Sequence, residues 1–107
     1  MPKPYSVEVK LGLQCSTWYS NLPSGELRKK VDSMLDALKE RPDAGDHVGK
    51  RLWPSTVAYQ GINNLWKYDI DREKRAAYTL KREREKLTVL VIEIFVSHKS
   101  YEKRFGY

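Results

Sequence analysis

The fold is organised around one apolar stretch near the end of the chain, Leu87-Thr88-Val89-Leu90-Val91-Ile92-Glu93-Ile94-Phe95-Val96. It is dense in β-branched and aromatic residues and lies between charged segments, a pattern that predicts a buried β-strand. It is far too short to cross a bilayer as a helix. Residues 97–107 follow and carry a histidine, two tyrosines, two lysines and an arginine. We therefore expect a buried strand that presents a polar site at one end of a sheet.

Size and composition are those of one soluble globular domain, residues 1–107. The chain has 107 residues, 40% of them hydrophobic and 32% charged, which suits a single hydrophobic core and excludes a wholly disordered chain. The formal net charge is +6 and the pI is near 9.5. A domain this basic attracts polyanions, chiefly nucleic acid or an acidic protein. The alternative is a well-solvated surface of the kind found in thermophiles rich in Lys, Arg and Glu.

The cysteine content and the first residues indicate the compartment. Cys15 is the single cysteine, so an internal disulfide and a cysteine-based zinc cluster are excluded, and we interpret it as a small core residue. The start, Met-Pro-Lys-Pro-Tyr, contains no apolar signal region. A reducing cytoplasm is therefore the expected location.

The first half of the chain predicts a strand and one or two helices. Residues 5–11 alternate apolar and polar side chains, the period of a half-buried strand, and residues 13–20 fit either a short helix or a loop. A helix is predicted at 25–40, because its apolar residues fall on one stripe that would pack on a sheet. The stripe consists of Leu27, Val31, Met34, Leu35 and Leu38. Pro42 ends this helix, and residues 41–49 are polar and rich in turn formers.

The second half predicts a meander of three strands. Strands are expected at 63–70 and 74–80, with a charged hairpin loop at 81–86 before the apolar strand. Strands that follow a helix and are joined by short loops predict an antiparallel sheet. The expected fold class is α+β, in the order β-α-(α)-β-β-β, with the N-terminal helices packed on one face of the sheet.

Several classes of site are excluded by what the sequence lacks. It has no glycine-rich phosphate loop and no His/Cys cluster at metal spacing, because His47 and His98 are its only histidines. The acidic residues are dispersed, so a two-metal nuclease is not expected. We therefore expect no metal and no cofactor.

Basic and phenolic residues are instead concentrated late in the chain. The candidates are Lys50, Arg51, Lys67, Arg75, Tyr78, His98, Lys99, Tyr101, Lys103, Arg104 and Tyr107. Such residues suit RNA cleavage by attack of the 2′-hydroxyl on its own phosphate, which needs a base, an acid and fixed cations. Arginine offers a fork that matches phosphate oxygens, and aromatic rings stack unpaired bases.

Strand periodicity predicts where two of these cations point. Within 74–80, Arg75 shares a side with the small Ala77, and Lys67 on the preceding strand is expected on the same, outward face. A structural alternative is that Arg75 pairs with Asp69 or Glu93 across strands. The other candidates have equally plain alternatives: His98 as a capping or packing residue, Lys50 and Arg51 as ordinary surface, and Trp53, Trp66 and Phe105 as core.

Five segments together resemble the RelE/ParE toxin superfamily, in particular archaeal RelE-like members. They are Pro42-Asp43-Ala44-Gly45, Lys50-Arg51-Leu52-Trp53-Pro54, Asn63-Asn64-Leu65-Trp66-Lys67-Tyr68, Arg75-Ala76-Ala77-Tyr78-Thr79-Leu80 and His98-Lys99-Ser100-Tyr101-Glu102-Lys103-Arg104-Phe105-Gly106-Tyr107. The resemblance covers the element order of the whole chain and is specific from about Pro42 onward. It implies a small antiparallel sheet with helices on one side, which agrees with the fold class above.

The resemblance also implies a function. RelE-type members are ribosome-dependent mRNA endoribonucleases, neutralised by an antitoxin that wraps the toxin or displaces its C-terminal segment. By motif, Arg75 corresponds to the strand arginine at the scissile phosphate and Tyr101 to the C-terminal phenol near the cleavage site, with Lys67 and His98 completing the expected catalytic set. Residues expected to bind the RNA are Lys50, Arg51, Lys99, Lys103 and Arg104. The expected partners are mRNA on the ribosome and a cognate antitoxin, with no membrane.

Three hypotheses follow from these observations. The first is a RelE-like mRNA interferase that needs no metal. The second is a non-catalytic module of the same fold, held by an acidic antitoxin-like partner or directed, as in ParE-type members, at DNA gyrase. The third is a basic RNA-binding domain that does not cleave. The first requires Lys67, Arg75 and Tyr101 to lie on one face of the sheet.

Overall fold

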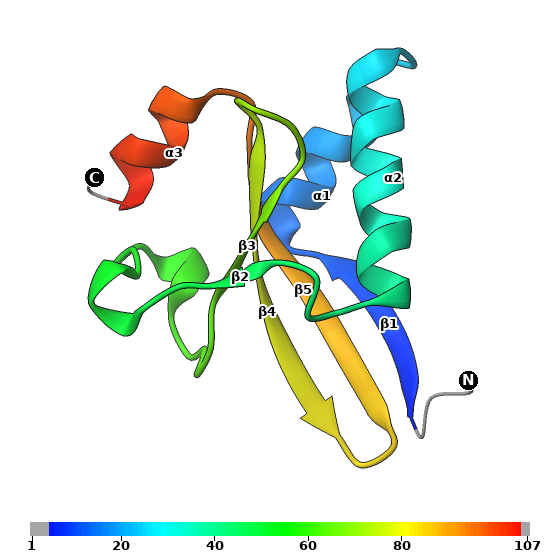
Figure 1. Ribbon diagram of the computed structural model, residues 1–107, viewed down its shortest axis with the longest axis vertical. Coiled ribbons are helices and arrows are strands. Elements are labelled where there is room, and N and C mark those ends of the chain that lie inside the picture. Colours follow the sequence, from blue (N-terminus) through cyan, green and yellow to red (C-terminus); the bar gives the residue numbers. More distant parts are fainter. Residues whose placement is uncertain (1–4, 106–107) are drawn as a thin grey trace.

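A computed structural model describes residues 5–105 and shows a five-stranded sheet with helices on both sides (Figure 1). The strands are β1 (Ser6–Leu11), β2 (Asp46–His47), β3 (Trp66–Asp69), β4 (Arg75–Glu83) and β5 (Lys86–Phe95). The helices are α1 (Leu13–Ser20), α2 (Glu26–Glu40) and α3 (His98–Phe105), with short 3-10 turns η1 (Lys50–Leu52) and η2 (Val57–Tyr59). The fold is thus α+β, as predicted, and the open alternative at 13–20 is resolved as helix α1.

The sheet order is β1-β5-β4-β3-β2. The apolar stretch forms β5, which lies between β1 and β4, and β3, β4 and β5 form the predicted antiparallel meander. The pair β1–β5 is parallel, because the chain crosses over through α1 and α2 before returning to the sheet. The sheet is therefore mostly antiparallel rather than entirely so.

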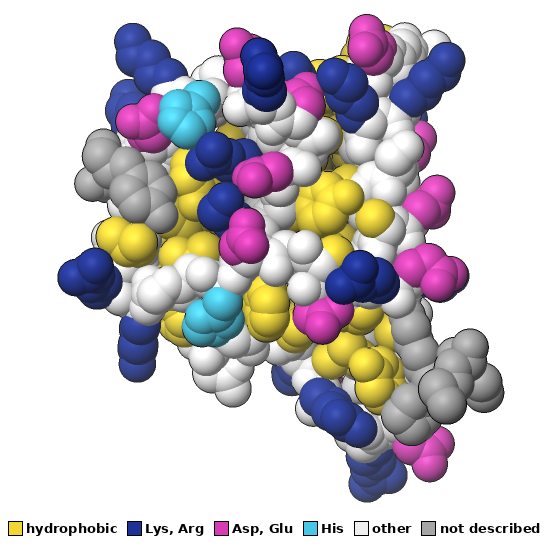
Figure 2. Space-filling view, in the orientation of Figure 1, with side chains coloured by type: hydrophobic (Ala, Val, Ile, Leu, Met, Phe, Trp, Pro, Cys, Tyr) yellow, Lys and Arg dark blue, Asp and Glu magenta, His cyan; other side chains and the backbone are white. Residues whose placement is uncertain are grey.

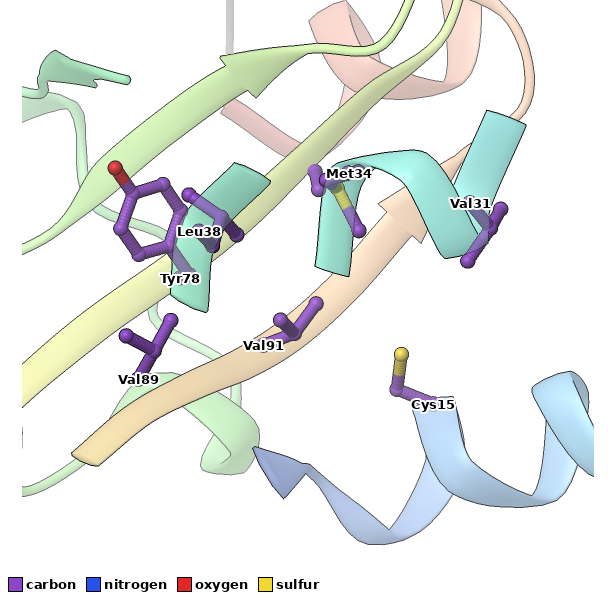
Figure 3. Close-up of a cluster of buried hydrophobic side chains, with 8 residues drawn as sticks. Cys15, Val31, Met34, Leu38, Tyr78, Val89 and Val91 are labelled. Atoms are coloured by element: carbon purple, nitrogen blue, oxygen red, sulfur yellow. The ribbon is translucent and has the colours of Figure 1, made fainter. Parts of the chain in front are cut away.

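The first core lies between the sheet and the two N-terminal helices. Val31, Met34 and Leu38 of α2 are at most 1% exposed and face Val89 and Val91 of β5 (Figure 3). They belong to the apolar stripe predicted from the helical period, so the stripe does pack on the sheet. The interpretation of the single cysteine as a core residue is also confirmed, since its side chain is buried in the same cluster.

A second core covers the opposite face, and the sequence did not predict it. Residues 98–105 form helix α3, on which Tyr101 and Phe105 are one helical turn apart and are both buried. They pack with Phe95 of β5 and with Tyr59 of η2. Ala77 belongs to this cluster and is completely buried. The expectation that the Arg75/Ala77 face is turned outward is therefore wrong for most of its length.

Two predicted boundaries also differ from the structure. Residues 81–86 are not a hairpin loop: β4 and β5 continue through them, and Arg84, at φ 53°, lies in the turn between the two strands. Charged side chains of alternating sign are solvated equally well on a projecting hairpin, and Lys86 is paired with Glu8 of β1. Strand β3 begins only at Trp66, because the Asn64 side chain bonds the Leu80 N–H and C=O, each at 2.8 Å, in place of a strand backbone.

The turn after α2 brings a further carboxylate to the sheet. The Tyr78 hydroxyl donates to the Pro42 carbonyl at 2.8 Å and accepts from the Gly45 N–H at 3.0 Å. Burial raises the pKa of Tyr78 to about 12, so the phenol stays protonated and the turn stays anchored. A side chain at Gly45 would press against Tyr78 and the backbone of Lys67. The next residue, Asp46, is thereby placed opposite Lys67 in the β2–β3 pairing.

Candidate functional site

Lys67 and Arg75 lie on the same face of the sheet and contact the same carboxylate. Lys67 Nζ is 3.3 Å from Asp69 Oδ1, and Arg75 Nε is 3.1 Å from the same oxygen. Asp69 and Arg75 are directly opposite one another in the β3–β4 register, which explains the short distance. Lys67 also lies 3.5 Å from Asp46 Oδ2. The four side chains form a row of alternating charge, which we call the ion-pair row.

The ion-pair row is at the surface, beside β3, where dark-blue and magenta side chains alternate down one face (Figure 2). Its cations are the more covered members: the side chains of Lys67 and Arg75 are 23% and 20% exposed, against 73% and 50% for Asp46 and Asp69. Partly covered cations keep more of their charge interaction with an incoming anion than fully solvated ones do. A phosphate can therefore bind to these cations if it displaces one of the carboxylates of the ion-pair row.

The guanidinium group of Arg75 lies over an aromatic ring. Its guanidinium carbon lies 4.9 Å from the centroid of the Tyr101 ring, a cation–π distance. Tyr101 itself is completely buried. Lys67, Arg75 and Tyr101 are thus on one face, as the first hypothesis requires. The buried position of Tyr101 does not fit its expected role as a phenol at the cleavage site, because the hydroxyl is not accessible to a substrate.

Of the two carboxylates that the structural alternative offered to Arg75, Asp69 contacts it, whereas Glu93 has other partners. Glu93 Oε1 accepts from the Tyr59 hydroxyl at 2.6 Å, and its Oε2 accepts from Arg104 Nε at 3.2 Å and Nη2 at 3.0 Å. Burial, followed by the bond to Glu93, raises the pKa of Tyr59 far above its ordinary value, so Tyr59 remains a donor. Arg104, expected to bind RNA, therefore holds α3 to β5 in this structure.

The other predicted site residues are exposed on α3 and η1. His98 Nε2 lies 2.9 Å from Glu102 Oε1 one turn along α3, so it has a local partner at the helix surface. Of the residues predicted to bind RNA, four besides Arg104 are exposed: Lys50, Arg51, Lys99 and Lys103. Tyr107 lies outside the described residues. Of the predicted catalytic set, the ion-pair row brings together Lys67 and Arg75, and the Tyr101 ring lies beneath Arg75.

Asp46 is the site residue that sequence reasoning missed. It lies on β2, a strand of two residues, which is too short to carry any periodic signal. The one sequence signal that points to it is Gly45, whose missing side chain allows the close approach to β3. The sequence offers Asp69 only as a partner of Arg75; its second contact, with Lys67, follows from the strand period, because residues two apart on β3 share a face.

Residues 5–105 contain neither a membrane-spanning helix nor a candidate metal site. No helix in this part of the chain is long and apolar enough to cross a membrane. No three His, Cys, Asp or Glu side chains within it are grouped to hold a metal ion.

Comparisons with known proteins show a likeness in structure rather than in sequence. No protein-family model matches the chain, and no curated protein matches it. Among solved structures, a YoeB/ParE toxin from Agrobacterium tumefaciens aligns with a TM-score of 0.54 at 18% identity, over 82% of this chain and 96% of that one.

A mutant of the E. coli toxin RelE in the free state aligns with a TM-score of 0.57 at 16% identity, over 97% of this chain and 96% of that one. Identities this low support the fold and not a particular activity. The resemblance found in the sequence is thus matched by the architecture, and the chain has the fold of the RelE/ParE toxins.

Proposed function

We propose that the protein is the toxin of a toxin–antitoxin pair and acts in the cytoplasm as a metal-free endoribonuclease on mRNA at the ribosome. The fold supports the toxin assignment. The observation that carries the catalytic part is the contact of Lys67 and Arg75 with one Asp69 oxygen. Two cations converging on a single anionic position are what a phosphate undergoing attack requires.

The proposed reaction is internal transesterification of RNA. The 2′-hydroxyl loses its proton to a base and attacks the adjacent phosphorus, and the 5′-oxygen leaves with a proton. Arg75 and Lys67 offset the charge that builds on the phosphate oxygens. His98, which is exposed on α3 three residues before Tyr101, is the proposed proton-transfer group. The exposed cations Lys50, Arg51, Lys99 and Lys103 bind the RNA backbone.

Induced expression in cells tests the proposal. The wild type should arrest growth and produce new internal mRNA ends, and Arg75→Ala should do neither while remaining folded by circular dichroism. Lys29→Ala, which removes a cation from α2 on the other face of the sheet, is the matched control and should arrest growth like the wild type. Wild-type arrest without new mRNA ends would contradict cleavage and indicate another target.

A second candidate is a binding module of the same fold that does not cleave RNA. The observations in its favour are the buried position of Tyr101 and the carboxylate partners of both cations. An acidic antitoxin or DNA gyrase would then be the partner. Absence of arrest from a folded protein favours this candidate, and RNA binding that falls steeply with salt, without cleavage, favours a plain RNA-binding domain.

A further inference from the structure

We propose that Asp69 and Tyr101 are positioning residues for Arg75, and that Tyr101 acts through its ring and not through its hydroxyl. The inference rests on the proposed ribonuclease function and assigns roles within the same site. It differs from the expectation drawn from the resemblance, in which the phenol of Tyr101 stands at the cleavage site. Three features of the structure carry it.

The first feature is the place at which Asp69 contacts Arg75. The contact is made by Nε, the inner nitrogen of the guanidinium, at 3.1 Å. Nε is buried, and its N–H has no aligned hydrogen-bond acceptor among residues 5–105, so the contact is an ion pair rather than a hydrogen bond. A carboxylate at the inner nitrogen fixes the rotation of the group while the two outer nitrogens still form a fork for a phosphate.

The second feature is the rigidity of the ring beneath Arg75. Tyr101 stacks on Phe105 with ring centroids 4.5 Å apart and meets Phe95 edge-on at 5.4 Å. All three rings are buried in the second core. A ring held on two sides keeps one orientation, so the guanidinium above it is confined to one plane.

The third feature is that the ion pair between Asp69 and Arg75 contributes little to the stability of the fold. Its carboxylate is half exposed, and exposed ion pairs contribute little to folding. Lys67 keeps a second carboxylate, Asp46, when Asp69 is removed. The main consequence of losing Asp69 is therefore misplacement of the Arg75 fork, which affects the reaction rather than the fold.

A cycle of Asp69→Ala and Arg75→Ala, with ribosome-bound mRNA as substrate, tests the role of Asp69. Asp69→Ala should lower kcat by about tenfold to a hundredfold, the usual result of misplacing a catalytic group by about 1 Å. The KM should stay the same or fall, because a carboxylate has been removed from a cationic surface. In an Arg75→Ala background the same change should cost less than about twofold, since Asp69 acts through Arg75.

Asp36→Ala is the matched control for the cycle. It removes one carboxylate from the exposed side of α2 and should leave kcat unchanged. If the loss of kcat in the double variant equals the product of the losses in Asp69→Ala and Arg75→Ala, the positioning role of Asp69 is overturned. A rise in KM at constant kcat would overturn it as well.

Tyr101→Phe and Tyr101→Leu separate the ring from the hydroxyl. Tyr101→Phe should keep kcat within about twofold of the wild type, because the platform is intact, and Tyr101→Leu should lower it by about tenfold or more. The proton NMR spectrum gives a readout independent of cleavage: Arg75 side-chain protons above the ring should be shifted upfield in the wild type and in Tyr101→Phe. That shift should be absent in Tyr101→Leu.

The outcomes distinguish the proposal from the function on which it rests. A wild type that cleaves no mRNA overturns the proposed function, and the positioning roles with it. If the wild type cleaves mRNA but Tyr101→Phe is as inactive as Tyr101→Leu, the proposed function stands. The role of the Tyr101 ring as a support for Arg75 is then overturned. Should Tyr101→Leu fail to fold, a wild-type spectrum without upfield Arg75 protons overturns the platform by itself.

Discussion

The two faces of the sheet are built in different ways. On one face, α2 lays an apolar stripe of regular helical period against β5, and Val31, Met34 and Leu38 are almost inaccessible. On the other face, α3 and the irregular segment between β2 and β3 cover β4 and β5 through Tyr59, Tyr101 and Phe105. The first face stabilises the fold. The second positions the candidate site, since Tyr101 supports Arg75.

The largest expected effect is on the α2 face. Leu38→Ala removes a completely buried side chain from the first core and should lower the free energy of unfolding by about 3 kcal/mol, because a cavity remains between α2 and the sheet. Urea unfolding followed by circular dichroism measures the change. Leu13→Ala is the matched control, since Leu13 is 85% exposed and should change the free energy little. Similar losses for both leucines would contradict the assignment of the first core.

Phe105→Ala tests the other face and should have a smaller effect. Phe105 is buried against Tyr101 and Phe95, but we expect α3 to detach by local unfolding while the sheet stays folded. We expect a loss of about 2 kcal/mol, below the usual range for Phe→Ala in a core. Hydrogen exchange should become faster in α3 while β4 and β5 stay protected. Uniform acceleration in all three elements would show that both faces unfold together.

Glu93→Gln probes the link between α3 and the sheet, with an expected loss of about 1 kcal/mol. Glu93 is bonded by both Tyr59 and Arg104, and a glutamine retains the shape but not the charge that both donors favour. The loss should be small because the Arg104 side chain is 42% exposed. Chemical denaturation of Glu93→Gln, Arg104→Ala and the double variant measures the coupling, and strictly additive losses would show that the pair contributes nothing.

The contrast between the faces also explains what the sequence could predict. The α2 stripe and β5 were predictable, because each repeats its period over several turns or residues. Helix α3 was not, because its apolar residues Tyr101 and Phe105 mark only one turn among charged neighbours. In the site, motif resemblance located Lys67 and Arg75. The orientation of Tyr101 and the approach of Asp46 depend on packing between distant segments, which no local pattern records.

The smallest expected effect concerns pH and lies at the end of β3. Asp71 accepts from Lys30 Nζ of α2 at 2.9 Å and from the N–H groups of Glu73 and Lys74, which holds the pKa of its carboxyl well below the ordinary 3.8. A depressed pKa in the folded state contributes stability above the ordinary value, and that contribution is lost as pH falls toward the folded pKa. Asp71→Asn should therefore be less stable than the wild type at neutral pH, and the difference should shrink steadily as the pH falls below the ordinary value of 3.8. Thermal unfolding between pH 7 and pH 2 measures the difference.

Glu26→Gln is the control, because the Glu26 side chain also approaches Lys30 but is largely exposed. A constant difference between Asp71→Asn and the wild type across this range would show that the carboxylate charge does not fasten α2 to the turn that precedes Arg75.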